Sequence, residues 1–256
     1  MRPSKTLAKL RAGKMVRMTA MGYFIPPFVR HAARHGFDCI WLDLEHRTME
    51  SREIQALLSY FHLYDVDCML RAPTLDKSKL YRYLEDGATG LMIPLVSTAE
   101  KARMLVDAVK FPPLGGRGLD GAGFDGDFYL DAGADFPERA NRETFLVVQI
   151  ETPEAVENCD AIAGVEGVDG LFVGPADLGL RYKHGSHNGM NVEQATDRVA
   201  AAAAKHGKAW GRPAPTLEDL KSFQARGARL LPHGNDFTAF MQKLEEWSKD
   251  FEATGG

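Results

Sequence analysis

The sequence predicts a single (β/α)8 barrel that spans residues 1–256 as one domain. Short apolar runs alternate with longer helical patterns eight times along the chain, and no shift in composition divides it. Strands that alternate with helices in this way favour right-handed crossovers and a parallel sheet. Eight such units in ~250 residues are most simply closed into a barrel, and the alternative is an open, doubly wound sheet.

Each predicted strand is a short apolar run that lies between segments of helical periodicity. The run at 145–150, for example, reads FLVVQI. The full set of predicted strands is 15–20, 37–42, 66–71, 90–95, 145–150, 169–173, 208–212 and 228–232.

The predicted helices carry start and stop signals. Glu100 follows Ser97 by three residues, which is the pattern of a capping box. Gly36 and Gly207 each end a helical segment before the next strand. The basic segment 2–17 is predicted to form an amphipathic helix that closes one end of the domain. The other helices are predicted near 26–35, 50–63, 76–86, 97–110, 152–163, 192–206, 216–226 and 236–252.

Residues 112–135 form a long, glycine-rich segment without a clear periodicity. Loops of this length inside a compact domain are usually functional or disordered. Its glycines at 118, 121 and 123 do not match the dinucleotide-binding fingerprint in order or context.

Composition excludes several classes of function. The formal net charge of −4 argues against nucleic-acid binding, which needs clustered lysine and arginine. No apolar run reaches the ~20 residues that a membrane-spanning helix needs, and the N-terminal segment lacks the apolar core of a signal peptide. The three cysteines show no metal-ligand spacing and are expected to be buried thiols in a reducing, cytoplasmic compartment.

Polar residues gather where the predicted strands end, which is the face that carries the active site in a (β/α)8 barrel. Any one carboxylate there is more simply explained as a helix cap, with the arginine as its ion partner. Convergence from separate strands weakens that explanation, because helix caps have no reason to gather around an arginine and a histidine. The residues concerned are Asp43, Glu45, His46, Arg71, Gln149, Glu151, Asp177, Arg212 and His233.

This set of side chains suits metal-assisted enolate chemistry. Two carboxylates with room for water and substrate oxygens favour a hard cation such as Mg²⁺ or Mn²⁺, which polarises the carbonyl of a 2-oxo acid. Arg71 is expected to stabilise negative charge on the enolate oxygen, and His46 to carry protons. The amides of Ala176 and Asp177, which open a helix, are placed to bind a carboxylate.

The competing way to form an enolate is a lysine Schiff base. Lys208 lies at the entry of its predicted strand, and Lys14 precedes the first strand. The other lysines fall in predicted helices or loops, so no lysine is expected at the active-site face.

Several segments strongly resemble the HpcH/HpaI family of class II pyruvate aldolases. The family includes 4-hydroxy-2-oxoheptanedioate aldolase and 2-dehydro-3-deoxyglucarate aldolase, and the likeness extends over about residues 5–245. It rests on the motifs WLDLEH at 41–46, RAP at 71–73, DGATGLMIPLV at 86–96, FPPLGGRG at 111–118, VVQIET at 147–152 and EGVDGLFVGPADL at 166–178.

The resemblance implies a metal centre with an adjacent acid–base group. Glu151 and Asp177 match the ligands of a divalent cation, Mg²⁺, Mn²⁺ or Co²⁺. Arg71 matches the arginine that contacts the keto oxygen, and His46 matches the acid–base histidine. Asp43 and Glu45 lie beside His46 in the same loop.

The resemblance also implies further substrate contacts and a partner for His46. Gln149, the turn 174–175 and the amides of Ala176 and Asp177 match the groups that bind the substrate carboxylate. Arg117 matches an arginine of a Gly-x-Arg-Gly segment. Glu85 stands where the family commonly has an aspartate paired with the histidine. Arg212 and His233 are candidates for contacting an anionic or polyhydroxylated acceptor, although a surface or intersubunit role is an equal alternative. The turn residues are Gly174 and Pro175.

The implied reaction is the reversible cleavage of a 4-hydroxy-2-oxo acid to an aldehyde and pyruvate, or a close 2-oxo acid such as hydroxypyruvate. The resemblance implies a homohexamer built from dimers that exchange their C-terminal helices. One alternative is an acyl-CoA lyase of the citryl or malyl type, for which the sequence offers no nucleotide-binding feature. Another is a non-catalytic protein that binds a keto acid.

Overall fold

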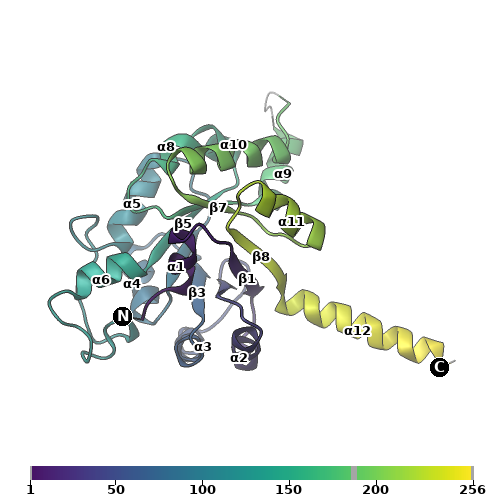
Figure 1. The fold of residues 1–256 in the computed structure, drawn as a ribbon, viewed down its shortest axis with the longest axis horizontal. Helices are drawn as coiled ribbons and strands as arrows, with labels where there is room; N and C mark the ends of the chain where they lie inside the picture. Colours follow the sequence, from purple (N-terminus) through teal and green to yellow (C-terminus); the bar gives the residue numbers. More distant parts are fainter. Residues whose placement is uncertain (1, 186–188, 255–256) are drawn as a thin grey trace.

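The computed structural model describes residues 2–185 and 189–254, and its eight strands form a closed parallel barrel in sequential order (Figure 1). Closure is made by β1 and β8, which pair in parallel with Val16 beside Leu230. The barrel prediction is therefore confirmed, and the open sheet is excluded. The strands are β1 (Val16–Met21), β2 (Cys39–Asp43), β3 (Asp67–Arg71), β4 (Gly90–Ile93), β5 (Phe145–Ile150), β6 (Gly170–Val173), β7 (Ala209–Gly211) and β8 (Leu230–Asn235).

Helices surround the barrel, and most begin and end close to the predicted positions. The segment predicted as one helix over 152–163 is two short helices that meet at Asn158, whose side chain donates a hydrogen bond to the Ser97 carbonyl. The range of α6 had no counterpart among the predicted helices, and only the start of α9, at Ala176 and Asp177, was predicted. The helices are α1 (Lys5–Arg11), α2 (Pro26–Arg34), α3 (Ser51–Leu63), α4 (Lys77–Glu85), α5 (Ala99–Val109), α6 (Phe136–Glu143), α7 (Pro153–Glu157), α8 (Cys159–Ala163), α9 (Pro175–His184), α10 (Val192–Lys205), α11 (Leu217–Ala225) and α12 (Asp236–Ala253).

The N-terminal helix α1 covers the end of the barrel at which the strands begin, as the sequence predicts. The buried carboxylate of Asp67, at the start of β3, accepts hydrogen bonds from the Ser4 hydroxyl and the Thr6 amide, each at 2.7 Å. Arg2 donates a further hydrogen bond to it at 3.0 Å. Leu7 packs with the side chains that fill the barrel interior. With this end closed, the opposite end is the face open to a substrate.

The core has two layers, one inside the barrel and one between the strands and the helices. Along β3, Met69 points inward, whereas Cys68 and Leu70 point toward the helices, as the two-residue period of a strand requires. Gly90 leaves room for the Phe145 ring, because a Cβ at position 90 would lie 2.2 Å from that ring. The interior is thus a core of packed side chains.

Helix α12 projects from the barrel and touches it only at its first turns (Figure 1). Asp236, its first residue, is buried and accepts hydrogen bonds from the Gly22 and Tyr23 amides. The helix carries a row of exposed apolar side chains, which are Phe237, Phe240, Met241, Leu244, Trp247 and Phe251. In the described part of the chain, no helix combines the length and the apolar character needed to span a membrane.

Candidate active site

Arg71 is the most tightly held charged side chain at the open end of the barrel. It lies at the end of β3 beside Asp43 of β2, and its guanidinium binds both oxygens of that carboxylate at 2.9 and 2.8 Å. Its third nitrogen lies 3.0 Å from Glu45 Oε2. The guanidinium also stacks 4.7 Å from the centre of the Trp41 ring. These contacts fix the position and orientation of the guanidinium group. A lysine side chain could not form the same set of contacts, because it lacks the planar group with several donors.

Asp43 organises the loop that follows β2. Burial alone would raise the pKa of Asp43, but the hydrogen bonds and charge of Arg71 outweigh it and hold the pKa below its usual range. The ionised carboxylate accepts hydrogen bonds from the Glu45 and His46 amides at 3.0 and 3.3 Å. The His46 ring therefore stands exposed at the rim, with Nε2 3.7 Å from Glu45 Oε2.

Glu151 is a buried carboxylate held from two sides. Its Oε1 accepts a hydrogen bond from the Leu95 amide at 2.7 Å, and its Oε2 accepts one from Gln149 Nε2 at 2.5 Å. Gly174 makes this arrangement possible, because a Cβ there would lie 2.4 Å from Glu151 Oε2. Only glycine fits at that position, which explains why a glycine precedes α9.

The surroundings of Glu151 disfavour its negative charge. Burial, helped by the negative charges of Glu45 and Asp177, raises its pKa to about 7 against the opposing effects of the Leu95 amide and Arg71. The negative charges of Glu45 and Asp177 therefore lie close enough to disfavour ionisation of Glu151. A bound cation would relieve this repulsion.

Asp177 lies in the first turn of α9, which follows β6, and β6 pairs with β5, the strand that Glu151 follows. Helix α9 begins with Pro175 after Gly174, so the amides of Ala176 and Asp177 belong to the first turn, where N–H groups have no partner within the helix. The Asp177 carboxylate is half-exposed and 4.0 Å from Arg181. An anion is stabilised at this end of a helix by the free amides and the helix dipole.

The donor set fits a hard divalent cation. Glu151 and Asp177 supply carboxylate oxygens, and Gln149 Oε1 is buried without a hydrogen-bond partner in the described structure. Within residues 2–185 and 189–254, no group of three or more histidine, cysteine, aspartate or glutamate side chains is arranged to hold a metal. A cation held by two carboxylates would complete its coordination with water or substrate oxygens, as Mg²⁺ commonly does.

The loop between β4 and α5 supports Glu151 and was not identified from the sequence. Leu95 has a φ of +56°, a left-handed conformation that non-glycine residues seldom adopt. Its amide binds Glu151, and its carbonyl accepts a hydrogen bond from Lys101 Nζ at 2.8 Å. The Val96 amide binds the Gln149 carbonyl. No sequence signal marks this position, since leucine is an unusual residue for a left-handed turn.

The structure corrects the predicted role of Arg212. Its guanidinium donates hydrogen bonds to Glu193 and Thr196 of α10 at 2.7 and 3.0 Å. It also stacks 4.4 Å from the centre of the Phe223 ring in α11. Arg212 therefore joins two outer helices and does not point into the rim. The Nδ1 atom of His233 lies 2.6 Å from the Ala214 carbonyl oxygen, so this side chain connects β8 to the segment that follows β7.

The predicted substrate contact of Arg117 is also wrong within this chain. Its side chain is 1% exposed, pairs with Asp125, and stacks 4.5 Å from the centre of the Phe111 ring. Arg117 therefore anchors the glycine-rich segment 112–135 from inside and is closed off from the rim. Burial raises the pKa of Asp125, against the lowering effect of Arg117.

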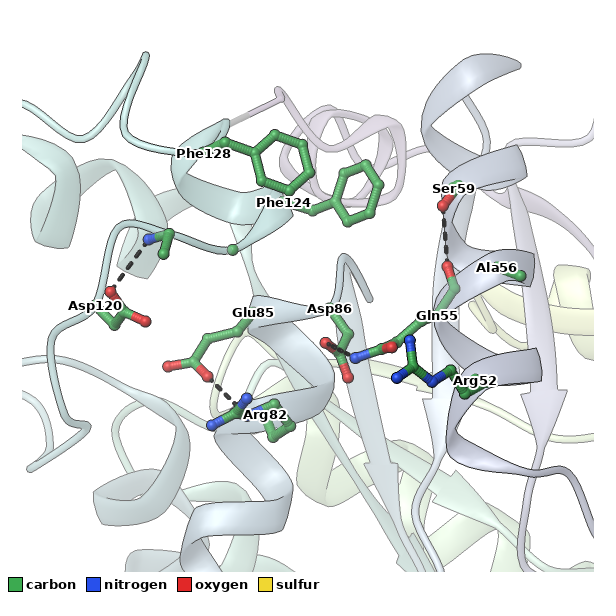
Figure 2. A pocket seen from close by; sticks show the side chains of 12 residues that line it. Arg52, Gln55, Ala56, Ser59, Arg82, Glu85, Asp86, Asp120, Phe124 and Phe128 are labelled. Atoms are coloured by element: carbon green, nitrogen blue, oxygen red, sulfur yellow. Dashed lines mark hydrogen bonds and ion pairs between the residues drawn. The ribbon is translucent and has the colours of Figure 1, made fainter.

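Glu85 does not pair with His46 within one chain. It ends α4, and a helix that follows a barrel strand runs back toward the end at which the strands begin. There its carboxylate lies 3.1 Å from Arg82 Nε and lines a cavity of about 500 Å³ between α3, α4 and the segment near Phe124 (Figure 2). This cavity lies outside the barrel, separate from the rim where Glu151 and Arg71 meet.

The structure thus brings together ten of the predicted residues around the open end of the barrel. The other four lie elsewhere or make contacts outside this group, and they are Glu85, Arg117, Arg212 and His233. The ten lie at or just beyond the ends of β2, β3, β5 and β6, and they are Asp43, Glu45, His46, Arg71, Gln149, Glu151, Gly174, Pro175, Ala176 and Asp177.

Known proteins resemble this chain over most of its length. A hydroxypyruvate/pyruvate aldolase of Delftia acidovorans is 34% identical over 236 residues, which cover 92% of this chain and 87% of the relative. A 5-keto-4-deoxy-D-glucarate aldolase of Klebsiella pneumoniae is 32% identical over 218 residues, covering 85% of this chain and 84% of the relative. Both names denote enzymes that cleave or form carbon–carbon bonds, which supports the predicted lyase class.

A solved structure gives the same result for the fold. The HpcH/HpaI aldolase of Desulfitobacterium hafniense superposes with a TM-score of 0.88 and 33% identity, covering 96% of this chain and 95% of that one. The sequence model of the HpcH/HpaI aldolase/citrate lyase family matches residues 23–242. The chain belongs to the HpcH/HpaI aldolase/citrate lyase family.

Proposed function

We propose that the protein is a divalent-metal-dependent aldolase. It reversibly cleaves a 4-hydroxy-2-oxo acid to an aldehyde and pyruvate, or a close 2-oxo acid such as hydroxypyruvate. The observation that carries this proposal is the buried Glu151 carboxylate, held by two hydrogen bonds at a rim that also receives Asp177 and Arg71. Relatives at 32–34% identity that are named as hydroxypyruvate/pyruvate and 5-keto-4-deoxy-D-glucarate aldolases support it.

Glu151 and Asp177 are the proposed ligands of the cation, which is Mg²⁺, Mn²⁺ or Co²⁺. When bound, the cation supplies Lewis-acid polarisation of the 2-oxo group. The chain itself supplies the orientation of Glu151, through the Leu95 amide and the Gln149 amide group. Because this carboxylate is already oriented, binding of a cation would not have to order its side chain.

Arg71 stabilises the negative charge that grows on the substrate carbonyl oxygen when the carbon–carbon bond breaks. Its contacts with Asp43, Glu45 and Trp41 hold the guanidinium in place before substrate arrives. Preorganised charge of this kind is usually a large contribution to catalysis. The substrate carboxylate would bind the free amides of Ala176 and Asp177, beside Gln149.

His46 is the proposed acid–base group. In cleavage its ring takes the proton of the 4-hydroxyl group, directly or through water, and in synthesis it returns that proton to the aldehyde oxygen. The turn made by Asp43 positions its backbone, and Glu45 lies beside its Nε2 atom.

Pyruvate release from a 4-hydroxy-2-oxo acid tests this proposal. We expect release to require a divalent ion, to stop with a chelator, and to recover when Mn²⁺ is restored. Glu151→Gln should lose metal binding and turnover together, whereas Arg34→Ala, at the opposite end of the barrel, should retain both. Release that survives exhaustive metal removal, or cleavage of an acyl-CoA thioester without pyruvate release, would contradict the proposal.

We also propose that the whole chain acts as one domain within a homohexamer in the cytoplasm. The exposed apolar row on α12 supports exchange of this helix between subunits, since such a surface is unfavourable in water. Three buried thiols without disulfides support a reducing compartment.

A further inference from the structure

We propose that Arg47 selects aldehydes that carry a carboxylate by binding that carboxylate beyond the reacting carbon. This inference rests on the proposed aldolase function and concerns a residue for which the motifs at the strand ends assign no role. Three observations carry it: the position of Arg47 on the rim, the way its side chain is held, and its lack of an anionic partner in the described structure.

The order of the strands fixes where the aldehyde must lie. In a closed barrel of eight sequential strands, β1 and β2 lie opposite β5 and β6. The 2-oxo acid is bound near Glu151 and Asp177, on the β5–β6 side. Its reaction partner has to meet His46, which follows β2. The far end of the aldehyde therefore points toward the segments that follow β1 and β2.

Arg47 stands at that far end. It follows His46 directly, and its Nη1 donates a hydrogen bond to the His46 carbonyl at 2.7 Å. Its carbon chain lies against Gly22 at the end of β1, where a Cβ would approach Arg47 Cγ to 2.6 Å. The guanidinium is 5.8 Å from the centre of the Tyr23 ring. The side chain is only partly exposed.

The charge of Arg47 is unneutralised. Arg71, Arg117 and Arg212 each pair with a carboxylate, whereas no ion pair joins Arg47 to any carboxylate among residues 2–185 and 189–254. One of its five N–H donors binds the His46 carbonyl, which leaves others for a planar, two-oxygen ligand. A carboxylate on the aldehyde fits this donor geometry, and a neutral aldehyde gains nothing from it.

The experiment compares aldehydes of similar length with and without a carboxylate. Aldol addition of pyruvate would be measured with succinic semialdehyde and with its uncharged counterpart pentanal, for the wild type, Arg47→Ala and Arg47→Lys. We expect Arg47→Ala to raise KM for succinic semialdehyde about 10- to 100-fold, the range for loss of a charged hydrogen bond. KM for pentanal should change less than about twofold, and Arg47→Lys should recover part of the loss.

Two controls separate this inference from the function on which it rests. The exchange of pyruvate methyl protons with solvent should be unchanged in Arg47→Ala, because exchange does not involve the aldehyde. Arg34→Ala, an exposed arginine on the opposite end of the barrel, should match the wild type with both aldehydes. If Arg47→Ala raises KM equally for the two aldehydes, or leaves both KM values unchanged, the role of Arg47 is overturned but the proposed function is not. A wild type that joins pyruvate to neither aldehyde overturns the proposed function, and this inference with it.

Discussion

At the scale of single residues, the site depends on Glu151 being charged where its surroundings disfavour charge. Two hydrogen bonds stabilise the carboxylate, but burial and the neighbouring charges of Glu45 and Asp177 act against it. The balance leaves its pKa at about 7, above the ordinary value of 4.5. A cation bound between Glu151 and Asp177 would reverse that balance, which links metal binding to stability.

Metal-free protein should therefore lose stability as the pH rises. The folded-state pKa of Glu151 lies above the unfolded value, so the folded state holds the extra proton and ionising it costs free energy. Between pH 5 and 8 the cost is on the order of 2 kcal/mol. Urea unfolding of metal-free wild type and Glu151→Gln at both pH values measures it. From pH 5 to pH 8, we expect the free energy of unfolding of the wild type to fall by that amount relative to the variant. The same pH dependence in the two proteins would contradict this explanation.

The sequence indicated which residues reach the rim, but it did not reveal their partners. Glu151 follows an apolar strand directly and Asp177 comes four residues after the end of another, and carboxylates in those positions are easy to recognise. Arg212 is the last residue of a predicted strand, yet its guanidinium points outward to Glu193 and Thr196 of α10. The direction of the Arg212 side chain depends on how α10 and α11 pack, and the sequence near Arg212 does not reveal that packing.

At the scale of elements, the β4–α5 loop holds Glu151 through an unfavourable backbone conformation. Leu95 is left-handed, and its side chain is 39% exposed, so little apolar burial offsets the strain. Its amide and carbonyl are both bound, to Glu151 and Lys101. The loop therefore stores strain in order to aim one N–H group at the proposed ligand.

A matched pair of substitutions measures this strain. Leu95→Ala keeps a Cβ and hence the strain, whereas Leu95→Gly relieves it while leaving the amide in place. We expect the glycine variant to be more stable than the alanine variant by about 1 kcal/mol, with Mn²⁺ affinity retained in both. Urea unfolding measures the stability of each variant, and a Mn²⁺ titration measures its metal affinity. A glycine variant that is the less stable of the two would show that the left-handed conformation carries no strain.

All eight strands were predicted, whereas one helix was missed and another was predicted only at its start, for a physical reason. A buried strand in a parallel barrel is an unbroken apolar run, so β5 was predicted at its observed bounds, Phe145–Ile150. Helix α6, only eight residues long, follows the irregular segment 112–135 directly and is too short for a clear periodicity. The break at Asn158 depends on a hydrogen bond to distant Ser97, which no local pattern shows.

At the scale of the whole molecule, α12 is an element without a partner in its own chain. Apart from Asp236 at its start, the helix exposes its residues, and the apolar row recurs every three or four positions. That spacing places the row on one face, which is typical of a helix that packs against another protein surface. The proposed homohexamer would bury it.

Charge placed in the apolar row should therefore break the assembly. We expect Leu244→Glu to yield a smaller species than the wild type, because a buried carboxylate without a partner is strongly unfavourable. Glu245→Lys, a charge change at the next position on the helix, should leave the assembly intact. Light scattering coupled to size-exclusion chromatography gives both masses. A wild type that is monomeric at all concentrations would contradict the oligomer proposal and leave the row unexplained.

The most direct test of the account is proton exchange at the methyl group of pyruvate, followed by NMR in deuterated water without any aldehyde present. It isolates enolate formation at Glu151, Asp177 and Arg71 from every question about the acceptor. We predict rapid loss of the methyl signal with Mg²⁺ or Mn²⁺, and none in metal-free protein or in Glu151→Gln. Exchange that persists without metal, or an unchanged methyl signal in the metal-loaded wild type, would contradict the central claim.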